Sequence, residues 1–419
     1  MTSIVASSFK PWVVWGIASF FYLYEMILRV SPSVMTQELM QEFQVSSTSL
    51  GVLISFYYFA YVPLQIPCGL IVDKFGTRRI ITFSAILCMM GTYLFGCSSS
   101  LLIAEIGRFL VGAGSACAFI GCLKVTVSWF RPHQFALIAG LSNMMGTLGS
   151  TFAGRPLATL VNLYGWRATT LCLSAMGVII IFLAWFGIQD SPSEKKSKLD
   201  QDSFHLWPTL KRIITNRQIW LAGTIGGLMY LPISAFSELW AVPFLMSCYN
   251  INSELASTAN IMLFLGMALG GPLAAWLAKI QKNYVKVMKI STLITAFLFL
   301  AIAYAQIVSL TVIFFLLLAS GITIGGQVLC FTCAKNNTPS EVSGTTIAFT
   351  NGIVMMSGVI FQPLLGWLLD LAWNGKLTNH GLRIYDHSCY QTAILAVPIC
   401  LFLSWILLHW LKDSYKTEE

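Results

Sequence analysis

The sequence has few charged residues and many apolar ones. Asp, Glu, Lys and Arg make up 10% of its 419 residues, whereas soluble domains carry about 25%. Hydrophobic residues make up 56% of the chain, and the mean hydropathy is +0.74. Such a chain lacks the polar side chains that a water-facing surface needs. This composition excludes a soluble globular protein and predicts an all-α membrane protein with about twelve transmembrane helices.

The sequence patterns of enzymes and of nucleic-acid-binding proteins are also missing. There is no glycine-rich phosphate loop followed by lysine, no Ser/His constellation and no metal-ligand cluster, so we expect no enzyme, no metal and no cofactor. Cys330 and Cys333 have no second cysteine pair and no histidine nearby, so we interpret both as packed core residues. Basic residues outnumber acidic ones by 25 to 17, but they lie in short loops, so we expect no nucleic acid partner.

The expected spans form two groups of six, separated by one long hydrophilic break. They cover residues 11–31, 50–72, 80–98, 101–126, 135–158, 167–188, 217–242, 256–279, 287–306, 308–332, 343–370 and 390–411. We therefore predict an N-terminal six-helix bundle at 1–189, a cytoplasmic linker at 190–216 and a C-terminal six-helix bundle at 217–419.

The two expected bundles resemble each other weakly and share one orientation. Asn143 precedes Pro156, and Asn351 precedes Pro363 at nearly the same spacing in the corresponding span. This similarity predicts two pseudo-symmetric bundles; chance similarity between glycine-rich helices is the alternative. Most Lys and Arg residues lie in loops on one side, which places both termini in the cytoplasm. No small-residue cleavage site ends the first span, so we expect it to be an uncleaved helix.

The most specific motif joins the second and third spans. Residues 69–79 read Gly-Leu-Ile-Val-Asp-Lys-Phe-Gly-Thr-Arg-Arg. They resemble the G-x-x-x-D-x-x-G-x-[RK]-[RK] signature of the major facilitator superfamily, and the number, grouping and orientation of the spans agree with that resemblance. The residues of this expected gating motif are Gly69, Asp73, Gly76, Arg78 and Arg79.

The resemblance implies a role for the aspartate of this motif. In the family, such a residue is thought to latch the cytoplasmic side by accepting from the N-terminus of another helix. Here that helix is the span that begins near residues 340–344, whose unpaired N–H groups favour an anion. Alternatively, Asp73 belongs to a plain tight loop whose charged residues only set the topology. Gly76 permits the tight turn in both cases.

Two opposite charges lie within the first span. Glu25 and Arg29 are four residues apart and therefore on one helical face, at a depth where charge is costly. In one interpretation they only neutralise each other. In the other, Arg29 binds a substrate carboxylate through its planar fork, while the protonation of Glu25 is linked to whether Arg29 is occupied. The second interpretation is the chemistry of proton symport.

Further candidate residues lie in other spans. Arg108 heads a glycine-rich fourth span and either pairs with Glu25 or Glu105, or contacts the substrate or takes part in proton coupling. Glu238 is the best second acid for proton coupling, and an exposed rim residue is its alternative interpretation. The aromatic and amide residues expected around the cavity, unless they serve only packing, are Tyr24, Tyr57, Tyr58, Tyr61, Gln65, Asn143, Tyr230, Trp240, Gln327, Asn351 and Gln362.

Together these features predict a secondary active transporter that works by alternating access. We expect proton-coupled uptake of a small carboxylate-bearing nutrient such as an amino acid, driven by an ion gradient. Export of a siderophore or drug by proton antiport is the alternative. The first span, around residues 24–35, is similar to that of a proteobacterial subgroup that includes intraphagosomal amino-acid and nucleoside importers, which implies a bacterial inner membrane. We expect a monomer whose partners are its substrate and the lipid bilayer.

Overall fold

The computed structural model describes residues 9–131, 134–189, 211–304, 309–338, 343–378, 381 and 383–413. Regular structure in these residues is helical, apart from one isolated β-bridge between Leu377 and Arg383. Within the described residues, eleven segments are long and apolar enough to cross a membrane. The predicted all-α membrane fold is therefore confirmed.

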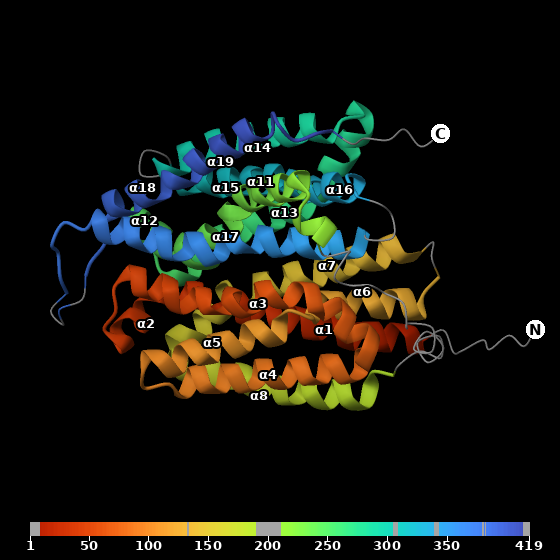
Figure 1. Ribbon diagram of the computed structural model, residues 1–419. Helices are drawn as coiled ribbons and strands as arrows, with labels where there is room; N and C mark the ends of the chain where they lie inside the picture. Colours follow the sequence, from red (N-terminus) through yellow and green to blue (C-terminus); the bar gives the residue numbers. More distant parts are fainter. Residues whose placement is uncertain are drawn as a thin grey trace, which may run out of the picture.

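The helices form two groups, which we call the N-half and the C-half (Figure 1). The N-half contains α1 (Lys10–Val30), η1 (Ser31–Val34), α2 (Thr36–Phe43), α3 (Ser47–Phe75), α4 (Thr77–Cys97), α5 (Leu101–Ser115), α6 (Ala118–Trp129), α7 (Phe135–Phe152) and α8 (Arg155–Gly187). The C-half contains α11 (Arg217–Leu231), η3 (Pro232–Trp240), α12 (Ala241–Tyr249), α13 (Ser253–Gln281), α14 (Tyr284–Ala303), α15 (Leu310–Ile324), η5 (Gly325–Val328), α16 (Leu329–Asn336), α17 (Ser343–Leu371), α18 (His387–Ile394) and α19 (Ala396–Leu407).

One candidate span is long enough for two crossings. Leu137–Gly187 has 51 residues, about twice the length that one crossing needs. Gly165 interrupts it with φ of 80° and ψ of 160°, which is not helical. This glycine therefore divides the segment into two crossings, in agreement with the predicted total of about twelve. The predicted domain boundaries stay a prediction, because 190–210 lie outside the described residues.

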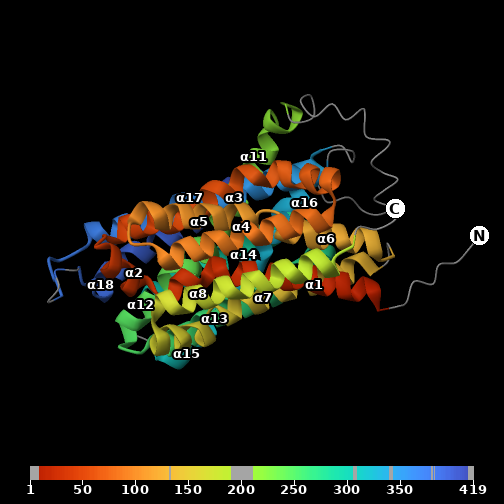
Figure 2. The same cartoon turned by 90° about the horizontal axis from the view of Figure 1, so that it is seen from below.

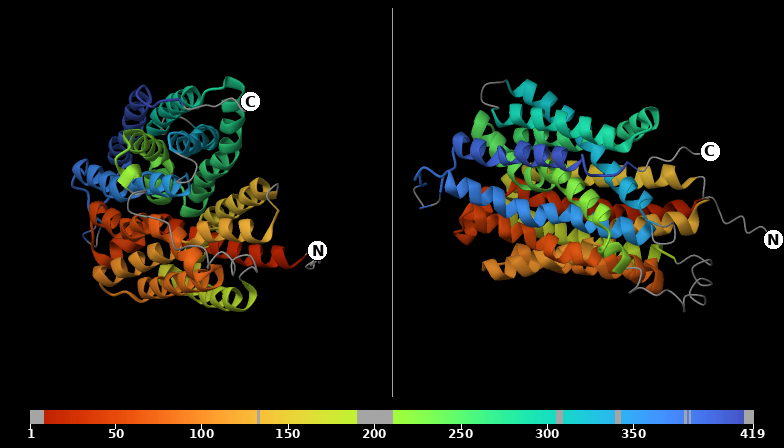
Figure 3. Two further views of the ribbon diagram at one scale, coloured as in Figure 1. Left: turned by 45° about the vertical axis from the view of Figure 1, so that its right-hand side comes forward. Right: turned by 45° about the horizontal axis from the view of Figure 1, so that its top comes forward.

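The two halves pack against each other along α3 and α17, and α13 of the C-half contacts α7 and α8 (Figures 1 and 3). The start of α1 and the end of α19 lie at one end of the bundle, while α2 and α18 lie at the other (Figures 1 and 2). We call the latter the distal end. A location of the first and last described helix ends on one side agrees with the predicted topology, and the assignment of that side to the cytoplasm stays a prediction.

Asp370 at the distal end of α17 joins the two halves. Its Oδ2 accepts from the N–H of Thr48 at 2.9 Å and from the Thr48 hydroxyl, in the first turn of α3. Its Oδ1 accepts from Arg383 at 2.9 Å and from the hydroxyl of Tyr385. A carboxylate at a helix N-terminus satisfies unpaired N–H groups and interacts favourably with the helix dipole. Asp370 therefore links the two halves at the distal end by capping a helix of the opposite half.

The gating motif is described in part. Gly76 joins α3 to α4 with φ of 85°, which confirms the predicted tight turn. Arg78 is half-buried, and its guanidinium carbon lies 4.4 Å from the ring centre of Trp185, while Arg79 is exposed. The surroundings of Gly69, the side chain of Asp73 and residues 339–342 lie outside the described part of the chain. The latch between Asp73 and α17 therefore stays a prediction.

We expect Asp370→Asn to destabilise the protein by loosening the contact between the halves. The change removes the charge from an acceptor of four hydrogen bonds, and the loss of bonds to a charged group costs about 1.5–3 kcal/mol each. Thermal unfolding in detergent would show the loss as a lower midpoint.

Asp386→Asn is the matched control, since the bonds of Asp386 to other described residues all lie within the C-half. The Ser388 hydroxyl at 2.6 Å helps to hold the pKa of Asp386 below its usual range. Both variants lose stability, but only Asp370→Asn should speed hydrogen exchange at the start of α3. Equal exchange there in both variants would contradict the assigned contact between the halves.

Candidate functional site

The first helix places two charged side chains in the interior of the protein. Glu25 and Arg29 lie on α1 and are 1% and 3% exposed. The α-helix ends one residue after Arg29 and continues as the 3₁₀ segment Ser31–Val34. Pro32 explains this change, because it has no N–H to donate to Leu28 and its ring would crowd that carbonyl in a continued α-helix. The end of α1 therefore leaves main-chain acceptors close to the charged pair.

Arg29 forms an ion pair with Glu238 of the opposite half. Its Nη2 lies 2.9 Å from Oε1 of Glu238, and both side chains are only 3% exposed. The same nitrogen donates to the hydroxyls of Tyr58 at 2.9 Å and Tyr230 at 3.3 Å. The hydroxyl of Tyr58 donates in turn to Oε2 of Glu238. A side chain of the N-half and a side chain of the C-half therefore meet in the interior of the protein. Tyr58 and Tyr230 bond to this ion pair and hold it in place.

The direct ion-pair partner of Arg29 is Glu238 and not Glu25. Glu25 and Arg29 share a helix face, but Arg29 pairs with Glu238, and Glu25 accepts from the hydroxyl of Tyr57. Sequence spacing could not show this, because Glu238 is more than two hundred residues away in the chain. Each of the two buried carboxylates therefore has its own tyrosine donor on α3.

Arg108 lies beside this cluster without a carboxylate partner in the described residues. Its Nη1 donates to the Leu28 carbonyl at 2.9 Å, and its guanidinium carbon lies 5.3 Å from the ring centre of Tyr57. It is 3% exposed. The predicted alternative of an ion pair with Glu25 or Glu105 is therefore wrong. Arg108 caps the end of α1 and adds a second positive charge to the cluster.

Glu238 belongs to a π-helix. Residues Pro232–Trp240 of η3 are all buried, and Glu238 is 2% exposed. The interpretation of Glu238 as an exposed rim residue is therefore wrong. π-Helical turns are rare and are frequent at functional sites. Gly358 on α17 completes the fit, because a Cβ at this position would overlap the ring of Tyr58.

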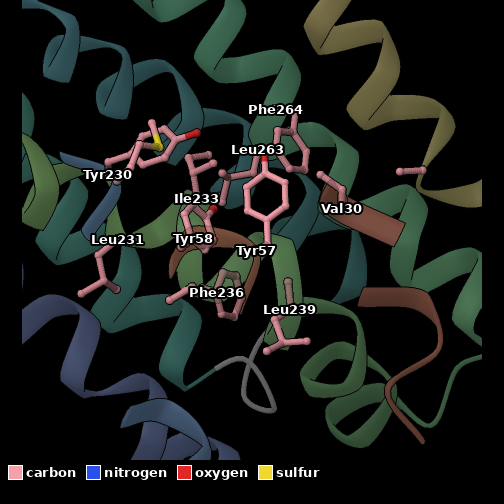
Figure 4. Close-up of a cluster of buried hydrophobic side chains, with 14 of the residues drawn as sticks. Val30, Tyr57, Tyr58, Tyr230, Leu231, Ile233, Phe236, Leu239, Leu263 and Phe264 are labelled. Carbon is pink, nitrogen blue, oxygen red and sulfur yellow. The ribbon is translucent and has the colours of Figure 1, made fainter. Parts of the chain in front are cut away.

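The surroundings of the charges are apolar. Figure 4 shows Tyr57, Tyr58 and Tyr230 in one buried cluster with Ile233 and Phe236. In such surroundings the electrostatic attraction between Arg29 and Glu238 is weakly screened, and an unpaired charge is costly.

The structure brings together some of the predicted cavity residues. Tyr58 and Tyr230 bond to Arg29, and the ring centre of Tyr61 lies 6.0 Å from its guanidinium carbon. Tyr57 bonds to Glu25. These four aromatic residues, with Glu25, Arg29, Arg108 and Glu238, make up what we call the central cluster.

Other predicted residues lie outside the central cluster. Tyr24 donates to the Leu173 carbonyl within the N-half, and Asn143 is exposed. Gln327 donates to Sγ of Cys330 at 3.6 Å within the C-half.

Asn351 also lies outside the cluster, but it joins the halves. It donates to Gln65 at 2.8 Å between α17 and α3. Tyr24 and Gln327 therefore have packing contacts in this structure, whereas Asn351 contributes to the contact between the halves.

Two residues near Arg29 were missed. Met355 of α17 places its sulfur 3.5 Å from Nη2 of Arg29. Tyr22 lies within electrostatic range of Glu25, Tyr61 and Arg29. Its position seven residues before Arg29 puts it on the same face of α1, so helical periodicity could have identified it. Met355 had no such signal.

Comparisons with known proteins agree with the fold. The family model described as Major Facilitator Superfamily matches residues 14–363. The chain is 23% identical over 391 residues to "Uncharacterized transporter YybO" of Bacillus subtilis (strain 168), covering 88% of this chain and 89% of the relative. It is 22% identical over 393 residues to "Probable galactarate/D-glucarate transporter GudP" of Escherichia coli (strain K12), covering 85% and 86%.

A solved structure is also similar. A bacterial homolog of the human lysosomal transporter Spinster, in an inward-facing and unoccupied conformation, superposes with a TM-score of 0.76 at 17% identity. The match covers 97% of both chains. At this identity the similarity shows the fold.

We expect Tyr58→Phe to lower the thermal unfolding midpoint more than Tyr24→Phe. Both hydroxyls are buried, but that of Tyr58 serves two charged groups and that of Tyr24 serves one carbonyl. Hydrogen bonds to charged groups contribute about 1.5–3 kcal/mol, against about 1 kcal/mol for neutral pairs. Equal midpoints for the two variants would show that the central cluster does not depend on Tyr58.

Proposed function

The chain belongs to the Major Facilitator Superfamily of secondary transporters, and from this premise we propose that it takes up a small carboxylate-bearing nutrient together with protons. The observation that carries the proposal is the buried ion pair between Arg29 and Glu238, which joins the two halves. A substrate carboxylate would replace Glu238 as the partner of Arg29. Both termini lie in the cytoplasm, and the membrane is the inner membrane of a bacterium.

Protonation of Glu238 is the event that frees Arg29. While Glu238 is ionised, it holds the guanidinium, and a second anion would be repelled. Once Glu238 is neutral, Arg29 has no charged partner, and leaving a buried charge unpaired costs about 3–5 kcal/mol. A substrate carboxylate removes that cost. Proton and anion therefore bind together, which is the basis of symport.

Arg29 has capacity for a further acceptor. Its bonds to Glu238, Tyr58, Tyr230 and Met355 all use Nη2. Its Nε is buried and has no partner among the described residues. A carboxylate can bind a guanidinium through two parallel bonds, and a substrate carboxylate that displaced Glu238 from Nη2 could bind Nε and Nη2 together.

The cluster can accept a second proton. Glu25 is buried and accepts from Tyr57, as Glu238 accepts from Tyr58. With both acids neutral, Arg29 and Arg108 leave two positive charges in the cluster. We propose Glu25 as the second proton-coupling residue and Arg108 as a contributor to anion attraction.

The relatives favour an organic acid over an amino acid. GudP, which is 22% identical, is named for galactarate and D-glucarate. The expectation of an amino acid rests on the resemblance of one helix to the intraphagosomal subgroup. We therefore propose sugar acids as candidate substrates in addition to amino acids. The monomeric state stays a prediction.

Thermal unfolding with a panel of ligands tests the substrate class. We expect D-glucarate, L-galactonate or glutamate to raise the midpoint at mildly acidic pH, because a ligand stabilises the state that it binds. Glucose, which carries no carboxylate, should leave the midpoint unchanged. A shift with glucose alone would contradict the role of Arg29.

Transport by Arg29→Lys and Glu238→Gln tests the mechanism. Lysine keeps the charge but loses the fork, so uptake of the stabilising acid should fall roughly tenfold or more. Glutamine mimics a protonated Glu238, so exchange of the acid should persist while accumulation driven by a pH gradient is lost. The measurement is radiolabelled uptake into proteoliposomes.

Arg167→Lys is the control, because it makes the same change from arginine to lysine outside the central cluster. Arg167 forms a 2.7 Å pair with Glu42, and both side chains are at least 36% exposed. This variant should transport normally. Gradient-driven accumulation that survives in Glu238→Gln would show that the proton site lies elsewhere, and Glu25→Gln is then the variant to compare.

A further inference from the structure

The helix that carries Glu238 has an unusual register. Residues Pro232–Trp240 form a nine-residue π-helix between α11 and α12. π-Helical hydrogen bonds join each carbonyl to the N–H five residues later, and the segment's cap follows this rule from Ala241 to Phe236. Long π-helices are rare, so neighbouring groups must stabilise this one.

Two prolines explain why the α-register is weak here. Pro232 and Pro243 lie at the start of the π-segment and just beyond its end. In an α-helix, Pro243 would leave the carbonyl of Leu239 without a donor and would clash with it. The prolines disfavour the α-helix, but they do not select the register that replaces it.

Two buried amide side chains bond to carbonyls of the π-segment. Gln362 of α17 donates through Nε2 to the Ser234 carbonyl at 2.7 Å. Asn260 of α13 donates through Nδ2 to the Ser237 carbonyl at 2.9 Å and accepts from the Ser237 hydroxyl at 2.7 Å. Ser234 lies one turn before Glu238, and Ser237 is the residue immediately before Glu238.

The bonding of Gln362 points to this role. Its Oε1 is buried and has no partner among the described residues. A buried amide oxygen without a partner costs about 1–3 kcal/mol. The hydrogen bond that this side chain does make among the described residues is the one from Nε2 to the Ser234 carbonyl of the π-segment. The main-chain carbonyl of Gln362 adds a further tie, since it accepts from Nε1 of Trp240 at 3.1 Å.

We propose that Gln362 and Asn260 are positioning residues that hold the π-register and thereby place Glu238 on Arg29. A shift of one residue toward the α-register would turn Glu238 by about 100° around the helix axis relative to the residues before it. Arg29 would then lose its ion-pair partner and become available to a substrate carboxylate. This inference rests on the proposed exchange of Glu238 for substrate and names the residues that control it.

Hydrogen–deuterium exchange tests the structural part without any ligand. Gln362→Leu keeps the side-chain volume but removes the donor, and it should speed exchange over residues 232–240 roughly tenfold. Ser357→Ala is the matched control. Its hydroxyl lies 2.7 Å from that of Ser234 between the same two helices and touches no carbonyl of the π-segment. This control should exchange like the native protein.

Proton-driven accumulation of D-glucarate in proteoliposomes tests the positioning part. Gln362→Leu should lose most of the accumulation while it keeps D-glucarate exchange, and Ser357→Ala should keep both. Unchanged hydrogen exchange over residues 232–240 in Gln362→Leu overturns the inference. Faster hydrogen exchange with unchanged accumulation also overturns it, because Glu238 would then be positioned by other groups.

A failure of the inference about Gln362 can be told apart from a failure of the proposed function. If the native protein does not carry D-glucarate, the proposed substrate fails, and hydrogen exchange still decides whether Gln362 holds the register. If Glu238→Gln keeps gradient-driven accumulation, the proposed proton site fails whatever Gln362→Leu does.

Discussion

The ion pair between Arg29 and Glu238 is the interaction on which the rest of the structure depends. It joins the two halves at their centre, where both side chains are 3% exposed. Two buried ions stabilise each other only while they remain together, because removal of either partner leaves an unpaired charge in apolar surroundings. In the proposed function, a substrate carboxylate takes the place of Glu238 beside Arg29, and a proton neutralises the carboxylate that is displaced.

The surrounding groups fix how this exchange can occur. Tyr58 contacts both members of the pair, and the π-helix sets the direction of Glu238. At the distal end, Asp370 holds the halves together by capping α3. The pair lies between this distal contact and the bond from Asn351 to Gln65 on the same two helices. Loss of the central pair would therefore weaken one of several contacts along α3 and α17, and the halves could move without separating.

Much of the fold could be predicted from the sequence, but the pairing of charges could not. Long apolar runs and the motif at residues 69–79 predicted the membrane helices and the superfamily, and helical spacing placed Glu25 and Arg29 on one face. Spacing within one helix gave no information about Glu238, which folding brings to Arg29 from the opposite half. The π-helix was also missed, because it depends on Gln362 and Asn260 from two other helices as well as on local prolines.

In the proposed function, substrate and proton bind together because both act on the pair between Arg29 and Glu238. Calorimetry tests this most directly, with the acid that stabilises the protein titrated in buffers of different ionisation enthalpy. We expect uptake of about one proton or more for each acid bound near neutral pH, and about one proton fewer in Glu238→Gln. Binding of the acid by the native protein without proton uptake would contradict the proposed function.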